Sequence, residues 1–290
     1  MSKATRLYTF KHKDDIDKIF KHPSFFIDQN KFEDSKVVKY RVKRIISGPV
    51  VEFSVYPLYK NDLPKRVKLG RESRPEQQAL NKKNMYKRAT RLVNTNFTVH
   101  DKSVVLTYVK PPKTIQEAQD NVKNFLRRLN YHHEKKGLPP VKFFFVTSIG
   151  FPPPAEPMHH HMIANLVDIE LAKKLWEQHG FLLVKKLHKS KKTKCFQPIV
   201  HYFLDQAKAA KRGGRKYFTS MNLEKPIEEV SDDFPIDLWD VYHGQLSQAK
   251  VFGYAYPDDK FHYTQSFCHD SEYVAGFYFY ARYVERDDYD

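Results

Sequence analysis

The chain has 290 residues, of which 41% are hydrophobic and 29% charged, so it can build a core and is not a disordered polymer. Its longest apolar run, near 274–281, is far shorter than the roughly 18 residues that cross a bilayer, and its first residues lack the apolar segment of a secretory signal. Two distant cysteines, Cys195 and Cys268, argue against a disulfide framework. We therefore expect a cytoplasmic protein that does not enter a membrane.

The excess of positive charge is the first indication of function. Lys and Arg number 50 against 34 Asp and Glu, and residues 227–290 alone hold 14 acidic and 4 basic side chains, which leaves 46 basic and 20 acidic for the rest. A body this basic favours a polyanionic partner, because Lys and Arg release condensed counterions when they meet phosphates. A solvated charged surface is the alternative.

The N-terminal part, residues 1–70, is predicted to be β-rich. β-Branched and aromatic residues at 36–46 and 50–59 flank the turn signal Ser47-Gly48-Pro49, which indicates a hairpin. A basic helix follows, opened by the capping pair Ser73 and Glu76. Its exposed cations could lie along a phosphate backbone or simply be solvated; they include Lys87, Arg88 and Arg91.

Residues 71–226 are predicted to form one domain. Strands at 104–108, 141–148, 158–166 and 181–187 alternate with helices that start at Thr114 and Asp168, and a helix at 198–210 follows; Gly180 is expected to end the second helix in a left-handed conformation. This order predicts an α+β fold, an antiparallel sheet with helices on one face in a ferredoxin-like split βαβ arrangement. Further candidate DNA-binding cations lie on the first of these helices and in the glycine loop after the last: Lys123, Arg127, Arg128, Lys211, Arg212 and Arg215.

The most informative motif is His159-His160-His161, on the third of these strands. Alternate side chains of a strand share a face, so His159 and His161 point together and His160 points away. Two imidazoles side by side can share a divalent cation and leave positions open for water or phosphate. Glu156, in the turn just before, is the candidate third ligand. A histidine pair that binds no metal is the alternative.

Tyr202 is the candidate nucleophile, on the predicted helix just before the glycine loop. A phenol becomes an effective nucleophile when a metal or a base stabilises its phenolate. A histidine pair on a strand and a tyrosine on a helix suit transesterification of a phosphodiester. A core or interface position is the alternative, since the chain holds 18 tyrosines.

In their order along the chain, these segments resemble the rolling-circle replication initiators, which are the HUH-type endonucleases of plasmids and phages. The resemblance covers roughly residues 94–226 and rests on Asn96 and Phe97, on 104–108, 125–129 and 159–163, on Tyr202, and on 217–226. It implies that His159 and His161 bind Mg²⁺ or Mn²⁺, and that Tyr202 nicks single-stranded or hairpin DNA at a replication origin and keeps a 5′-phosphotyrosyl bond. Thr107 and Tyr108 would support the site.

The chain departs from this family at two positions. Where the family has a glutamate at the end of the strand before the histidines, this chain has Ser148, so Glu156 is the acid left to bind the metal. Three residues after the nucleophile, where the family commonly has a lysine, this chain has Asp205, with Lys208 the nearest base. Asp205 is one helical turn from Tyr202 and could itself reach the metal.

Residues 227–290 form an acidic, aromatic C-terminal extension outside the resemblance. Strands are predicted at 251–256 and 274–284, and aromatic side chains at this density favour a packed domain or self-association. The chain lacks the Gly-x-x-x-x-Gly-Lys-Ser/Thr loop of a helicase motor, so an initiator of this kind would need a separate helicase.

Two other functions are compatible with the sequence. A non-catalytic single-stranded DNA- or RNA-binding protein with a decayed site would bind in a salt-sensitive manner, indifferent to metal and to Tyr202→Phe. A structural or regulatory protein would show no preference for single strands or hairpins.

Overall fold

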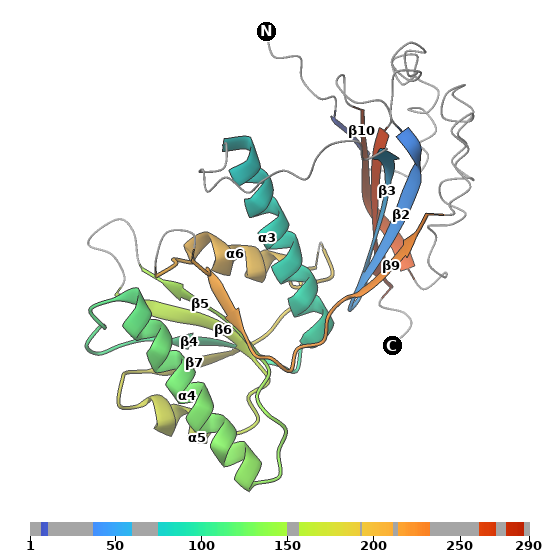
Figure 1. The fold of residues 1–290 in the computed structure, drawn as a ribbon. Coiled ribbons are helices and arrows are strands. Elements are labelled where there is room, and N and C mark those ends of the chain that lie inside the picture. The colour runs from blue at the N-terminus through green and yellow to red at the C-terminus, as the bar shows by residue number, and fades with distance from the viewer. Residues whose placement is uncertain are drawn as a thin grey trace. The chain divides into compact units, whose positions relative to one another are not determined.

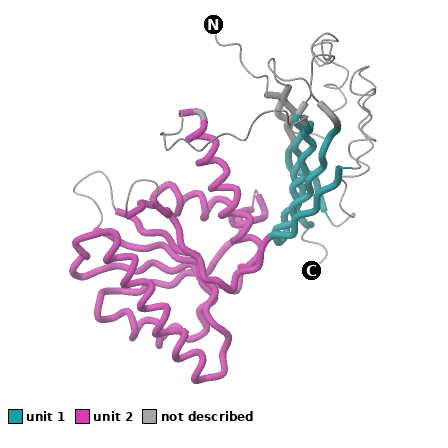
Figure 2. The backbone as a smooth tube through the Cα atoms, in the orientation of Figure 1, with its two compact units in different colours: residues 1–72, 226–290 teal, residues 73–225 magenta. Residues whose placement is uncertain are grey.

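The computed structural model describes residues 7–10, 37–59, 75–149, 157–191, 193–210, 214–232, 261–270 and 277–286. The chain divides into two units, residues 1–72 together with 226–290, and residues 73–225 (Figure 2). Each unit contains one antiparallel sheet, and the described helices belong to the second unit, so the predicted α+β class is confirmed. None of the helices in the described ranges is long and apolar enough to cross a membrane.

The first unit joins the two ends of the chain in a six-stranded sheet. The strand order is β1-β10-β11-β3-β2-β9, formed by β1 (Leu7–Phe10), β2 (Val37–Ser47), β3 (Val50–Tyr59), β9 (Ile227–Ser231), β10 (Phe261–Asp270) and β11 (Phe277–Glu285). Strand β11 pairs with β3 from Phe279 opposite Val55 to Val284 opposite Val50, and Gly48, at φ 53°, makes the turn of the predicted hairpin. The N-terminal segment and the C-terminal extension therefore share one sheet; the strand predicted at 251–256 lies outside the described residues.

Opposite charges line the edge of this sheet. Strand β9 is exposed along its whole length, and its carboxylates pair with cations of β2. The Lys43 Nζ lies 2.7 Å from the Glu228 carboxylate, and the Arg44 Nε lies 2.7 Å from that of Glu229. Part of the acidic extension thus neutralises the chain's own basic strand.

The second unit contains a five-stranded sheet with the order β7-β4-β6-β5-β8 (Figure 1). Its strands are β4 (Lys102–Leu106), β5 (Phe143–Ser148), β6 (His159–Ala164), β7 (Leu182–Lys186) and β8 (Tyr217–Thr219), and its helices are α3 (Pro75–Asn96), α4 (Ile115–Lys135), α5 (Ile169–Trp176) and α6 (Gln197–Gln206). The connections β4-α4-β5 and β6-α5-β7 each skip one strand of the antiparallel sheet, which is the split βαβ order.

Helices cover both faces of this sheet, whereas the sequence predicted them on one face. Helices α4 and α5 pack on one core, and α3 and α6 pack on the other (Figure 1). The reason lies in the apolar run at 143–146, because Phe145 enters the first core and Phe144 and Val146 enter the second. A strand that is apolar on both faces needs cover on both.

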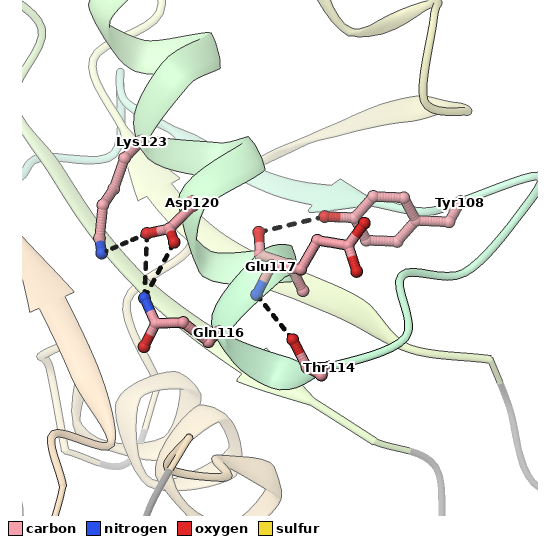
Figure 3. Close-up of polar contacts among 7 residues, drawn as sticks. Tyr108, Thr114, Gln116, Glu117, Asp120 and Lys123 are labelled. Atoms are coloured by element: carbon pink, nitrogen blue, oxygen red, sulfur yellow. Dashed lines mark hydrogen bonds and ion pairs between the residues drawn. The ribbon is translucent and has the colours of Figure 1, made fainter.

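The predicted helix starts are confirmed in the two helices of the split motif. The Thr114 hydroxyl accepts a hydrogen bond from the Glu117 N–H at 3.1 Å at the start of α4 (Figure 3). At the start of α5, the Asp168 carboxylate accepts the Leu171 N–H at 3.0 Å. Both contacts satisfy N–H groups that have no partner within the helix.

Gly180 does not end α5 in a left-handed conformation, because the described glycines with positive φ are Gly48 and Gly137. Its role is close approach instead. A Cβ at Gly180 would lie 2.3 Å from the backbone oxygen of Thr107 and 2.8 Å from the Tyr108 Cα. The chain after α5 therefore passes directly against the segment after β4.

Strand β4 and helix α6 end earlier than the sequence predicts. Strand β4 stops at Leu106, so Thr107 and Tyr108 lie just after it. Helix α6 stops at Gln206 rather than at residue 210, because the following residues pair with the end of β5. The Lys208 N–H donates to the Thr147 carbonyl at 2.9 Å, and Ala207 forms a bridge with Ser148.

Candidate active site

Two of the three histidines meet on one face of β6. The Nε2 atoms of His159 and His161 lie 3.1 Å apart, and both side chains are buried, with 6% and 7% of their surfaces exposed. The His159 Nδ1 lies 2.9 Å from the Pro157 carbonyl, which can only accept a hydrogen bond. Nδ1 therefore donates to this carbonyl, and Nε2, the atom that faces His161, is the nitrogen available to a metal.

Helix α6 places Tyr202 beside this pair. The ring centroids of Tyr202 and His161 are 5.4 Å apart in an edge contact, and the Phe203 ring stacks on His161 at 4.9 Å. Val200, Phe203 and Leu204 bury the inner side of the helix, whereas 52% of Tyr202 is exposed. The helix thus holds the phenol next to His161 and half exposed to solvent.

Gln206 is a site residue that sequence reasoning missed. Its Oε1 lies 3.1 Å from the Nε2 of His161, and the Ser148 hydroxyl donates to the same oxygen at 3.4 Å. Residues four apart on a helix share a face, so the spacing from Tyr202 to Gln206 is the signal that could have found it.

The arrangement fits a divalent cation with two nitrogen ligands and one oxygen. Ligands about 2.1 Å from an octahedral ion lie about 3.0 Å from one another, close to the 3.1 Å between the histidine nitrogens and to the 3.1 Å from His161 to Gln206. Among the described residues, no three His, Cys, Asp or Glu side chains group around a possible ion, and the oxygen beside His161 is the amide oxygen of Gln206.

The expected acidic ligand is not found in the described part of the site. Ser148 stands directly opposite His159 in the β5–β6 register, at the position where the family has its glutamate, and it contacts Gln206. The other candidate, Glu156, lies outside the described residues.

The middle histidine, His160, is fixed on the opposite face of β6. It is fully buried; its Nε2 lies 2.8 Å from the Tyr108 hydroxyl and its Nδ1 lies 3.1 Å from the Thr147 hydroxyl. The Tyr108 hydroxyl donates to the Ala118 carbonyl at 3.2 Å, in the first turn of α4 (Figure 3). Consequently Nε2–H donates to Tyr108, and Nδ1 accepts from Thr147.

Its surroundings keep His160 neutral. Burial, and then the neighbouring His159 and His161, lower the pKa of His160 to about 3. Burial also raises the pKa of Tyr108 well above its ordinary value. Tyr108 therefore supports β6 from the face opposite His159 and His161. Thr107 instead donates its backbone N–H to the Phe181 carbonyl at 2.9 Å.

Asp205 faces α3 rather than the histidines. The Tyr86 hydroxyl donates to its carboxylate at 2.5 Å, and the Lys82 Nζ lies 3.9 Å away. Burial, and then the hydrogen bond to Asp205, raise the pKa of Tyr86 above its ordinary range. The interpretation of Asp205 as a metal ligand is therefore not supported. Its hydrogen bond with Tyr86 connects α6 to α3.

The predicted DNA-binding cations divide between the two faces of the sheet. Lys87, Arg88 and Arg91 lie on α3, on the same face as Tyr202, and Arg88 and Arg215 both act electrostatically on Tyr217. The cations of α4 lie on the opposite face of the sheet from Tyr202: Lys123, Arg127 and Arg128. The Lys123 Nζ is paired with Asp120 at 2.8 Å (Figure 3). Lys208 is exposed; Lys211 and Arg212 lie outside the described residues.

Comparison of the chain with protein-family models, with curated proteins and with solved structures finds no match.

Proposed function

We propose that this protein is a rolling-circle replication initiator that nicks one strand of origin DNA through a covalent bond to Tyr202. The observation that carries the proposal is the edge contact between Tyr202 and His161, whose Nε2 lies 3.1 Å from that of His159. A phenol open to solvent thus stands beside a buried pair of imidazoles, in a sheet with the split βαβ order.

In the proposed reaction the Tyr202 oxygen attacks the scissile phosphorus and loses its proton to solvent. The bond from phosphorus to the 3′ oxygen breaks, and that oxygen takes up a proton as a free 3′-hydroxyl. The 5′ phosphate stays esterified to Tyr202, so the same bond can be exchanged for a strand end later without an external energy source.

His159, His161 and Gln206 are the residues that would hold Mg²⁺ or Mn²⁺. Such an ion would act as a Lewis acid on a phosphate oxygen. His160, Tyr108 and Thr147 keep the two imidazoles in place from the other face of β6. Asp205 holds the nucleophile's helix against α3 through Tyr86.

One observation favours a second candidate, the non-catalytic single-stranded DNA- or RNA-binding protein. Ser148 occupies the position of the family's acid, and Asp205 replaces its lysine and turns toward α3. A site that lost these groups could still bind nucleic acid through its cations.

Covalent capture separates the two candidates. The protein is mixed with labelled single-stranded and hairpin oligonucleotides from its own replicon, with Mn²⁺, Mg²⁺ or EDTA, and label that survives denaturing electrophoresis is measured. We expect a metal-dependent adduct that disappears in Tyr202→Phe and in the double variant His159→Ala/His161→Ala. Tyr131→Phe is the matched control, because Tyr131 is an equally exposed tyrosine (53%, against 52% for Tyr202) on another helix. Tight binding without any adduct would favour the non-catalytic candidate.

A further inference from the structure

The first turns of α3 present an outward stripe of polar side chains. Gln77, Asn81, Asn84 and Arg88 are exposed and follow one another at spacings of four, three and four residues, which places them on one face of the helix. The buried side chains of α3 are Tyr86, Ala89 and Val93, together with Thr90 and Asn94. At 100° per residue, the stripe lies on the side of the helix opposite these buried residues.

This stripe differs from the outer faces of the neighbouring helices. Helix α3 has five Lys or Arg and one acidic residue, Glu76, in its first turn. Helix α4 instead alternates Glu117 and Asp120 with its cations, and α5 does the same with Glu170. Asparagine is also a poor helix former on an exposed surface, where alanine, lysine or glutamate would stabilise the helix more. Within the stripe, the Gln77 Nε2 donates to the Asn81 Oδ1 at 2.9 Å, which leaves each amide a further donor and acceptor. The stripe thus presents three amides and one cation, with no carboxylate.

We infer that the outward stripe of α3 binds duplex DNA in the major groove and reads its bases. Asn and Gln form paired hydrogen bonds with the N6 and N7 of adenine, and Arg forms them with the O6 and N7 of guanine. The excess of cations on α3 complements the phosphate backbone on either side of the groove. The amides therefore supply sequence preference, and the neighbouring lysines supply affinity.

The dimensions of the stripe suit this role. Eleven residues separate Gln77 from Arg88, about 16 Å of helix, which matches about five base pairs. An α-helix fits the major groove of B-DNA. The first turns of α3 extend beyond the other elements of this unit (Figure 2), and residues 77–84 are exposed throughout.

The same helix contacts the proposed nucleophile's helix, and this gives the inference its place in the proposed function, on which it rests. Tyr86 on α3 bonds Asp205 on α6, three residues after Tyr202, and its ring meets that of His201 at 4.9 Å. A duplex held by the outward stripe would keep the nicking site at a fixed distance from the recognised sequence.

The test uses the full chain carrying Tyr202→Phe, so that no cleavage occurs, and a random-sequence duplex library as the probe. Repeated selection is expected to give a shared motif, which the protein binds at least about tenfold more tightly than a scrambled duplex. The triple variant Gln77→Ala/Asn81→Ala/Asn84→Ala should lose most of this preference and keep its affinity for the scrambled duplex. Alanine favours the helix, so the variant is expected to fold.

Two further variants sharpen the comparison. Lys83→Ala/Lys87→Ala should weaken binding to both duplexes equally and make binding less sensitive to salt. The matched control Gln116→Ala/Asn124→Ala removes two exposed amides from α4 and should change neither affinity. The inference is overturned if selection yields no motif, or if the triple variant keeps the full preference. Duplex preference is measured without chemistry, so this result is independent of whether covalent capture with native Tyr202 succeeds.

Discussion

The Nε2 of His160 lies 2.8 Å from the hydroxyl oxygen of Tyr108, across 52 residues of chain. This contact joins the strand that carries the candidate metal ligands to the segment after β4. The Tyr108 hydroxyl in turn donates a hydrogen bond to the Ala118 carbonyl of α4. His160 stands between His159 and His161 in sequence and on the opposite face of the strand. Its hydrogen bonds therefore fix the backbone from which both candidate ligands project.

Breaking this contact should lower both stability and metal affinity. Tyr108→Phe leaves the buried Nε2 of His160 without a hydrogen-bond partner. His160→Phe leaves the Thr147 hydroxyl without one. We expect each variant to lower the free energy of unfolding by about 1–3 kcal/mol, measured by urea titration. The double variant should cost less than the sum of the two, because both lose the same contact.

Mn²⁺ binding, followed by electron paramagnetic resonance on the folded fraction, tests whether the contact also positions the site. We expect weaker Mn²⁺ binding in Tyr108→Phe and no change in Tyr131→Phe. Unchanged Mn²⁺ affinity in a destabilised Tyr108→Phe protein would mean that the contact serves stability alone.

Gln206 should contribute to metal binding in a way that depends on its terminal group. Gln206→Ala removes the oxygen 3.1 Å from the His161 Nε2 and is expected to weaken Mn²⁺ binding about tenfold. Gln206→Glu restores an oxygen and adds a negative charge, so it should bind Mn²⁺ more tightly than the native protein. Calorimetric titration with Mn²⁺ measures both changes. Equal affinities in all three proteins would remove Gln206 from the ligand set.

Replacement of Gly180 by alanine should be destabilising for a steric reason. The added Cβ would lie 2.3 Å from the Thr107 carbonyl oxygen, and this oxygen also accepts the Trp176 indole N–H at 2.9 Å, so it cannot move without loss. We expect a cost of about 2 kcal/mol or more, measured by denaturant unfolding. Gly137→Ala is the comparison, because its added Cβ meets open space and costs about 1–2 kcal/mol through its positive φ of 65°. A smaller effect at Gly180 than at Gly137 would contradict the close-approach role.

Asp168 should give stability a pH dependence in the acid range. The Lys136 ammonium, 2.8 Å away, and the Leu171 N–H lower the pKa of Asp168 in the folded protein. The charged form is therefore favoured by folding, and its contribution is full above the ordinary aspartate pKa of about 3.9 and is lost as the pH falls through the lowered value.

Asp168→Asn keeps an oxygen that can cap α5 but has no charge to titrate. Thermal unfolding at a series of pH values should show a difference in midpoint between native and variant protein that is constant near neutral pH and shrinks under acid conditions. The same comparison made in a Lys136→Met background should show a smaller difference. A difference that stayed constant down to the lowest pH would exclude the charge of Asp168 as its source.

The features predicted well from sequence are those decided over a few neighbouring residues. Thr114 and Asp168 cap their helices because each side chain reaches an N–H only three residues ahead. The shared face of His159 and His161 follows from the two-residue repeat of a strand.

The features that sequence reasoning missed are contacts between distant segments. The position of Asp205 one helical turn from Tyr202 predicts that it can reach a metal, but its carboxylate accepts a hydrogen bond from Tyr86, 119 residues away. Gln206 enters the site because the last turn of α6 packs beside β5 and β6, where its side chain contacts His161 and Ser148. Helices cover both faces of the sheet because the apolar run 143–146 supplies two cores, which a single strand pattern does not reveal.

By itself, the sequence determined the charge, the α+β class, the helix caps and the pairing of two histidines on one strand face, because each depends on composition or on local geometry. Only the tertiary structure decided that Tyr202 and Gln206 lie beside those histidines, that Tyr108 holds His160 from behind, and that the two ends of the chain share one sheet. Such contacts depend on how the strands and helices pack, and side chains far apart in sequence leave no local pattern from which that packing can be derived.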